Sequence, residues 1–232
     1  MALVKFGAGI VGMSGKIGGT IFARNRYGSY ARAGTKPINP NSPRQVKMRG
    51  IMATLSTRWA QMLTGAQRIG WDLYGSSVSM KNRLGESTFL TGFNHYLRCN
   101  SPIGDIGNAY IDAPPTIFEL PEKDPTFACS ISEATQVVTI TFDDTADWCD
   151  ELKGMIYIIQ GYPQNAQRNF FAGPWKGRTA KMGSDIAPPT SPETFASIHV
   201  VAENQKTWLQ ARIGRADGRI SEPFLCSVAV DS

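Results

Sequence analysis

The spacing of hydrophobic residues changes partway along this chain of 232 residues. Between residues 43 and 97, apolar positions recur every three or four residues, which is typical of α-helices with one buried face. After residue 116 they alternate with polar positions in short runs, as in half-buried β-strands. The pattern predicts a helical module over 42–100, a linker over 101–115 and an all-β domain over 116–232.

The segment before this module, residues 1–41, is a glycine-rich arm that contains one predicted β-hairpin. Its strands cover residues 20–25 and 29–33, around a glycine turn. Small and charged residues such as Ala23 and Arg24 interrupt the two faces, so neither face is strongly apolar. A hairpin of this kind is marginal in water, and we expect it to need a partner surface.

Two to three helices are expected in the helical module. Ser42 is a typical N-cap with proline after it, so the first helix runs over about 43–63. Thr64 and Gln67 have the spacing of a capping box, which starts a second helix over about 65–75. A third short helix is expected over 87–97. The positions expected to be buried in the first two helices are Met48, Ile51, Met52, Leu55, Trp59, Met62, Ile69, Trp71, and Leu73 or Tyr74.

About seven short strands are expected in the C-terminal part. They cover residues 127–131, 136–142, 154–159, 170–172, 194–201, 207–213 and 224–230. Asp217-Gly218 adds a hairpin turn signal. So many short strands separated by turns are typical of an immunoglobulin- or fibronectin-like sandwich. The predicted fold class is therefore mixed: a small α+β N-terminal module of arm, hairpin and helices, followed by an all-β immunoglobulin/fibronectin-like sandwich.

The net charge of +5 conceals a sharp division along the chain. Residues 1–112 contain 14 Lys and Arg but only four acidic residues, and none of these precedes Asp72. Residues 113–232 contain 10 Lys and Arg against 15 acidic residues. Such asymmetry indicates two modules with different surroundings.

The four cysteines are scattered without a C-x-x-C pair, and the chain has only two histidines. We therefore expect small buried thiols in a reducing compartment and no metal site. No run approaches the ~18 apolar residues of a membrane span, and no secretory signal is evident at the start. These features predict a soluble protein that is made in the cytoplasm and does not contact a membrane.

Residues 7–12 match the G-x-G-x-x-G pattern of dinucleotide folds, but the helix and the acidic residue that this chemistry needs are missing. Gly15 and Gly18 would interrupt a helix there. Neither His95 nor His199 lies in a recognisable context for a catalytic base. We therefore expect no enzymatic activity, no cofactor and no small-molecule substrate.

The basic N-terminal region is the strongest candidate for function, because cations and aromatic residues interleave along it. The candidate contact residues are Lys16, Arg24, Arg26, Tyr27, Tyr30, Arg32, Lys36, Arg44, Lys47 and Arg49. They could neutralise phosphates of nucleic acid without reading its sequence. They could instead meet an acidic surface of a neighbouring subunit, including the C-terminal part of another copy. We favour subunit contact, because a glycine-rich arm can also add a strand to a neighbour's sheet.

Three stretches carry a resemblance to a known group of proteins: SGKIGGTIFARNRYG at Ser14–Gly28, KPINPNSPRQ at Lys36–Gln45 and LTGAQRIGW at Leu63–Trp71. Over about residues 10–75 the chain resembles a family of uncharacterised phage and prophage proteins. The resemblance implies a bacteriophage virion structural protein, such as a capsid decoration, head–tail joining or tail component. Its partners would be other virion proteins, copies of itself and packaged nucleic acid, and its location the virion.

Two alternatives stay open at this point. One is a phage protein that binds nucleic acid without sequence specificity through its basic arm. The other is a host-surface or carbohydrate-binding module on the sandwich loops, with Trp148, Tyr162 and Trp175 as candidates. For these aromatic residues we favour core packing or turn anchoring, given the usual burial of such side chains.

Overall fold

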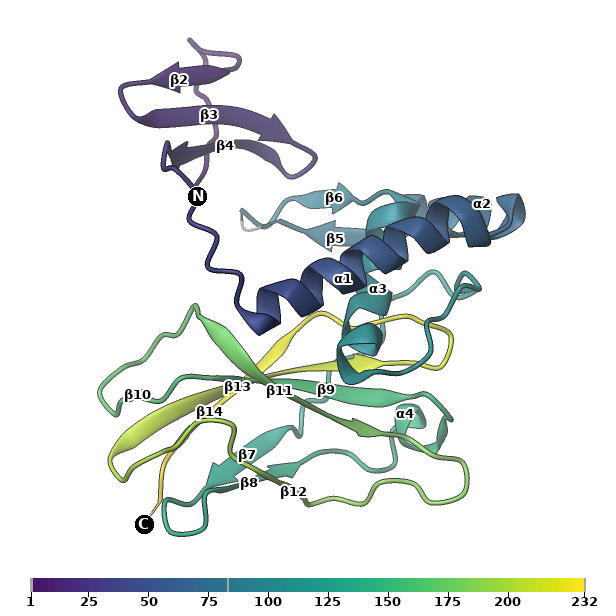
Figure 1. Cartoon of the computed structure of the whole chain (residues 1–232), viewed down its shortest axis with the longest axis vertical. Helices are drawn as coiled ribbons and strands as arrows, with labels where there is room; N and C mark the ends of the chain where they lie inside the picture. The colour runs from purple at the N-terminus through teal and green to yellow at the C-terminus, as the bar shows by residue number, and fades with distance from the viewer. Residues whose placement is uncertain (1, 83, 232) are drawn as a thin grey trace. The chain divides into compact units, whose positions relative to one another are not determined.

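The computed structural model describes residues 2–82 and 84–231. The chain folds into two compact units. The first unit comprises Met1–Leu97 and Thr116–Phe118, and the second comprises Arg98–Pro115 and Glu119–Ser232. Helices and several antiparallel sheets make the fold a mixed α+β one (Figure 1).

A small antiparallel sheet in the first unit has the strand order β1-β4-β3-β2. The strands are β1 (Ala2–Leu3), β2 (Gly15–Ile17), β3 (Thr20–Asn25) and β4 (Gly28–Ala33). β3 and β4 form the predicted hairpin, with Asn25 paired to Gly28 at its turn. Gly28 has a φ of 112°, a conformation that glycine adopts without a steric penalty.

Two helices of the first unit begin at the predicted capping residues. α1 (Pro43–Thr57) follows Ser42, whose hydroxyl accepts from the Gln45 backbone N–H while the Gln45 side chain accepts from the Ser42 N–H. α2 (Gly65–Ser77) follows Thr64, which makes the same reciprocal pair of bonds with the residue three positions on. Each box satisfies amide groups that lack an intrahelical partner, and a cap is worth ~1 kcal/mol.

Between these helices, η1 (Arg58–Met62) is a π-helical turn rather than a continuation of α1. A π turn contains more residues than an α turn, so it shifts the side chains that follow out of the expected phase. Met62, predicted to be buried, is 60% exposed, whereas Leu55 before the turn is fully buried. The prediction for Met52 is also wrong, since it is 40% exposed.

Aromatic side chains form the core of the first unit. Trp71 meets Tyr74 and Tyr96 edge-on, with ring centroids 5.9 and 5.5 Å apart. Trp59 lies 5.5 Å from Tyr96. Because α2 turns Trp71 and Tyr74 inward, Ile69 lies on its outer side and is 71% exposed, contrary to the prediction.

The third helix begins and ends later than predicted. Ser87–Phe89 forms β6, which pairs with β5 (Ser79–Lys81), and α3 covers Gly92–Ile106. The start signal is Thr91, whose hydroxyl accepts a hydrogen bond from the Asn94 N–H. The first residues of the predicted linker are therefore helical. No helix among the described residues is both long and apolar enough to cross a membrane.

The second unit contains two antiparallel sheets that share one hydrophobic core (Figure 1). One sheet has the order β12-β8-β7, and the other the order β10-β13-β9-β11 with β14 also paired to β13. The strands are β7 (Ala128–Ile131), β8 (Val137–Thr141), β9 (Met155–Gly161), β10 (Gln164–Asn165), β11 (Trp175–Met182), β12 (Glu193–Ala196), β13 (Gln205–Gly214) and β14 (Phe224–Ala229), and α4 (Asp147–Asp150) is a short helix. This arrangement is compatible with a β-sandwich.

The core between the sheets follows the predicted alternation of apolar residues. Val138 and Ile140 come from the three-stranded sheet, and Leu209, Ala211 and Ile213 come from alternate positions of β13. All five side chains are at most 5% exposed. The period of two therefore places one face of each sheet in the core.

The strand prediction fails at the edge of the larger sheet. Residues 170–172 lie in a loop, and the strand is β11, which follows them. β11 contains Lys176, Arg178 and Lys181, so it lacks the apolar alternation on which the prediction depends. Charged residues are common on edge strands, where they discourage pairing with other chains.

A disulfide joins Cys129 on β7 to Cys226 on β14, with Cα atoms 6.4 Å apart. The bond links the two sheets, and its cysteines are 97 positions apart in sequence. The prediction that all four cysteines are free thiols is therefore wrong for Cys129 and Cys226. Cys99 and Cys149 are buried thiols. Burial raises the pKa of Cys99 to about 11 and that of Cys149 to about 12, so both stay protonated at neutral pH.

Replacing Cys129 and Cys226 together by serine is expected to lower the free energy of unfolding by about 2–4 kcal/mol, because the unfolded chain becomes less restricted. Urea denaturation of the double variant and the unmodified chain measures this difference. In urea without reductant, iodoacetamide should label only Cys99 and Cys149. Labelling of all four cysteines would contradict the disulfide.

Candidate interaction surface

The arm and the small sheet contain no buried residue. From Ala2 through Gly50, every residue is at least partly exposed. The largest side chains of the sheet, including Phe22 and Tyr30, are only partly buried. A sheet is normally stabilised by covering one face with another layer. This sheet therefore lacks a core of its own.

The pairing of the strands distributes the predicted contact residues over both faces of the small sheet. Lys16 and Arg32 both pair with Ile21 and flank it in one row across the sheet. Tyr30 is two positions from Arg32 and shares that face. Arg24 is three positions from Ile21 and lies on the opposite face. The sheet thus presents cations on both sides.

Several predicted contact residues are occupied within the first unit. Arg26 donates to the Phe89 carbonyl at 3.1 Å and so ties the hairpin turn to β6. Arg49 donates to two asparagine side chains of the segment before α1, at 2.6 and 3.0 Å. Arg44 and Lys47, in the first turns of α1, also have partners in the chain. These four residues therefore have structural roles.

The remaining cations are open to solvent. Among residues 2–82 and 84–231, the side chains of Lys16, Arg24, Arg32 and Lys36 have no hydrogen-bond or ion-pair partner. All four residues are exposed, as is Tyr27 at the hairpin turn, which is 37% exposed. Unpaired cations on a sheet without a core form a surface suited to an acidic partner.

The glycine pattern at the start of the chain does not build a dinucleotide site. It is followed by β2, and the first helix of the described chain begins only at Pro43. A Cβ atom at Gly7, Gly9 or Gly12 would meet no heavy atom within 4 Å. Close packing does not require glycine at these positions, unlike in a pyrophosphate-binding turn.

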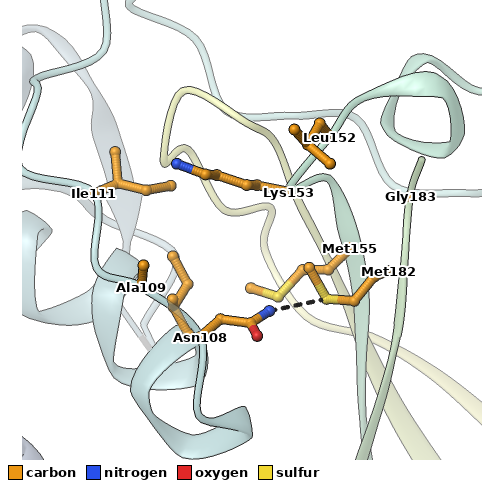
Figure 2. Close-up of a pocket in the computed structure, with 9 residues that line it drawn as sticks. Asn108, Ala109, Ile111, Leu152, Lys153, Met155, Met182 and Gly183 are labelled. Atoms are coloured by element: carbon orange, nitrogen blue, oxygen red, sulfur yellow. Dashed lines mark hydrogen bonds between the residues drawn. The ribbon is translucent and has the colours of Figure 1, made fainter. Parts of the chain in front are cut away.

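A cavity of about 370 Å³ lies in the second unit, beside the loop that follows α3. Its lining is mainly apolar and includes Ile111, Met155 and Met182 (Figure 2). The Asn108 amide points at the Met182 sulfur, 3.4 Å away, and Lys153 supplies the one cation. The cavity has room for a small apolar group, but it gathers no nucleophile or acid–base pair.

A buried polar group pins the end of α3 to the larger sheet within the second unit. The Tyr157 hydroxyl donates to Asp105 at 2.6 Å, and the Arg178 Nε lies 3.3 Å from the same oxygen. With two donors on one carboxylate oxygen, Asp105 has a structural role rather than a catalytic one.

Arg212, on β13, is a further titratable group and is partly buried. Burial and then the nearby Arg98 lower the pKa of Arg212 to about 10, so its guanidinium remains charged at neutral pH.

The other titratable candidates are also structural. Arg215 holds the acidic turn around α4 by ion pairs to Glu151 and Asp147, at 2.5 and 3.1 Å. His95 is buried and lies 5.0 Å from the Tyr74 ring in the first unit. Within the described ranges, no three His, Cys, Asp or Glu side chains come together as ligands for a metal ion.

The aromatic residues suggested for a carbohydrate site separate into two groups. Trp148 belongs to the core of the second unit and is 1% exposed, as core packing predicts. Tyr162 is 38% exposed, and Trp175 is partly buried. Trp175 begins β11, and Tyr162 follows the last residue of β9, with which Trp175 pairs.

Comparison with known proteins assigns no family. No protein-family model matches the chain, and the comparison with curated proteins found no match. One solved structure with some similarity is a family 76 glycoside hydrolase from a bovine Bacteroides thetaiotaomicron strain, at 13% identity and a TM-score of 0.31. The match covers 47% of this chain and 21% of that protein. A likeness this weak carries no argument about fold or activity.

Because the small sheet has no core, replacing Tyr30 by alanine is expected to lower the free energy of unfolding by less than about 1 kcal/mol. The matched control is Trp71→Ala in the aromatic core of the same unit, where the loss should be about 3–5 kcal/mol. Urea denaturation followed by circular dichroism compares the two variants. Equal losses would mean that the small sheet is already stabilised within the chain.

Proposed function

We propose that this chain is a non-enzymatic structural protein of a bacteriophage particle. It assembles through its basic arm and small sheet and displays the second unit as a capsid decoration, head–tail joining or tail component. The observation that carries the proposal is a four-stranded sheet without a buried residue that bears unpaired cations on both faces. A neighbouring subunit would supply the missing layer. The resemblance of residues 10–75 to phage and prophage proteins supports the virion as its location.

Charge indicates which neighbours can supply that layer. Two small sheets from different copies would repel each other, because both are basic. Residues 113–232 instead carry an excess of acidic over basic residues. We therefore propose that the partner is an acidic surface, either on the C-terminal part of another copy or on a second virion protein.

We further infer that the second unit is an immunoglobulin- or fibronectin-like sandwich. Residues 209–211 of β13 pair with both β9 and β14, so these two strands lie on opposite sides of β13. The larger sheet then has the strand order β11-β9-β13-β14 and faces the sheet β7-β8-β12. The chain crosses repeatedly between the two sheets, and this connectivity supports an immunoglobulin- or fibronectin-like fold. The disulfide departs from the antibody pattern, since it joins the first and last strands at the sheet edges.

A second candidate is binding of nucleic acid without sequence specificity. The same unpaired cations favour it, together with the exposed ring of Tyr27 among them. Affinity of this kind would fall steeply with salt, in proportion to the phosphates neutralised. It would reside in residues 1–60 and would be lost when Arg24 and Arg32 are reversed in charge.

The test is quantitative mass spectrometry of purified, nuclease-treated particles from a phage or induced prophage that encodes this chain. The proposal predicts a fixed copy number relative to the major capsid protein. The double variant Arg24→Glu/Arg32→Glu should reduce incorporation at least about tenfold, because two ion pairs become repulsive.

The control is Lys123→Glu/Lys153→Glu, which reverses two exposed cations of the second unit, breaks the ion pair of Lys123 with Glu222, and should be incorporated normally. Absence of the chain from nuclease-treated particles would contradict the virion role. If, in addition, the unmodified chain binds DNA in a salt-sensitive way and Arg24→Glu/Arg32→Glu loses this binding while the control variant keeps it, the nucleic-acid role replaces the virion role.

A further inference from the structure

Aromatic rings and cations cluster at one end of the larger sheet of the second unit, and neither role above uses them. Phe171, in the loop between β10 and β11, meets Trp175 edge-on at 4.9 Å and stacks on Trp208 at 5.4 Å. It lies over Gly161, where a Cβ atom would overlap the ring. Gly161 pairs with Trp175, so the rings form a row across the sheet.

Three cations lie over rings of this cluster. They are Arg168 over Phe171 at 6.0 Å, Lys206 over Trp208 at 5.5 Å and Lys176 over Tyr162 at 4.9 Å. Over the part of the chain that the structure describes, none of the three has an acidic partner. Contact with a ring face holds each cation in place without neutralising it. We call these cations and the rings beneath them the ring–cation surface.

The sequence around this surface departs from the acidic character of its domain. Residues 152–184 contain five Lys and Arg and no Asp or Glu. The remainder of the C-terminal part is therefore still more acidic than its average. A local positive surface in an acidic domain attracts anions there while other faces repel them.

The loop that carries Phe171 is held in a fixed conformation. The Arg168 Nε donates to the Phe170 carbonyl at 2.8 Å, and its Nη1 donates to the Gln164 side chain at 2.6 Å. Phe171 is buried, yet the neighbouring Phe170 is 72% exposed. The loop therefore presents an apolar ring to solvent beside the three cations.

Tyr162 and His199 complete the cluster beside Lys176. Their rings stack with centroids 4.1 Å apart and planes at 29°. Burial and then the Lys176 ammonium lower the pKa of His199, so its imidazole is neutral at pH 7. The positive charge of the surface therefore comes from the three ring-bound cations.

The exposed groups match sugars better than nucleotide bases. Stacking of successive bases needs several open ring faces, but Phe171 and Trp208 are each 5% exposed and His199 covers one face of Tyr162, so Phe170 is the one widely exposed ring of the cluster. The loop instead presents exposed amides at Gln167 and Asn169, and the exposed Asn165 amide of β10, whose oxygen accepts from the Gln167 N–H at 3.0 Å, lies beside them in sequence. Each amide offers donors and an acceptor together, which suits neighbouring hydroxyl groups of a sugar.

We propose that the ring–cation surface binds an acidic polysaccharide. Arg168, Lys176 and Lys206 pair with its carboxylate or sulfate groups, and the loop amides bond to its hydroxyl groups. Phe170 packs against the C–H face of a sugar ring. This binding goes beyond the assembly role and holds or fails independently of it.

The test measures binding of the full-length chain to alginate, a polyuronate, and to dextran sulfate, with neutral dextran as the control polymer. The basic arm could also bind polyanions, so the background carries Gln in place of Lys16, Arg24, Arg32 and Lys36. In that background, Lys176→Glu/Lys206→Glu should weaken binding to at least one acidic polymer about tenfold or more. Lys123→Glu/Lys153→Glu should leave it unchanged.

A second pair of variants tests the apolar contact. Phe170→Ala should weaken binding, whereas Leu225→Ala, which removes a side chain that is 60% exposed on β14, should not. Thermal unfolding of every variant checks that it folds. The proposal is overturned if neither acidic polymer binds, if the two charge variants bind alike, or if a thymidine oligonucleotide binds as tightly and through the same residues.

Discussion

A β-sheet persists in water only when another layer covers at least one of its faces. The second unit meets this requirement internally, because its two sheets close over one core and a disulfide ties their edges together. The small sheet of the first unit does not meet it, since no residue from Ala2 to Gly50 is buried. This difference underlies the proposed roles of the two units, in which the first unit makes the assembly contacts and the second unit is displayed.

Charge follows the same division. The arm and small sheet contain no acidic residue, and four of their exposed cations, Lys16, Arg24, Arg32 and Lys36, have no partner among the described residues. In the second unit several cations form ion pairs, as Arg215 does with Glu151. At the ring–cation surface, rings rather than carboxylates hold the cations. Each unit thus has an uncompensated positive surface among its described residues, and we propose an acidic ligand of a different kind for each.

Local signals were predictable from the sequence, and long-range ones were not. Capping at Ser42 and Thr64 depends on residues three positions apart, so both helix starts were predicted correctly. The exposure of Met62 depends on a π turn that no propensity marks. The pairing of Cys129 with Cys226 depends on contact between strands 97 positions apart, and spacing alone does not reveal it.

The two candidate surfaces differ in the same way. The basic arm is continuous in sequence, so its residues could be named in advance, although contacts made in the fold occupy Arg26 and Arg49. The ring–cation surface brings together the end of β9, a loop and the start of β13, and it requires glycine at position 161. Its one linear signal is the acid-free run over residues 152–184, which the average charge of the domain conceals.

Hydrogen–deuterium exchange of the backbone amides over residues 15–33, in the free chain and in assembled particles, tests the central claim most directly. The account predicts rapid exchange in the free chain, slowed about a hundredfold or more on assembly, with β13 protected in both states as the internal control. Slow exchange of residues 15–33 already in the free chain, or no slowing in particles, would contradict the claim that this sheet is completed by a neighbouring subunit.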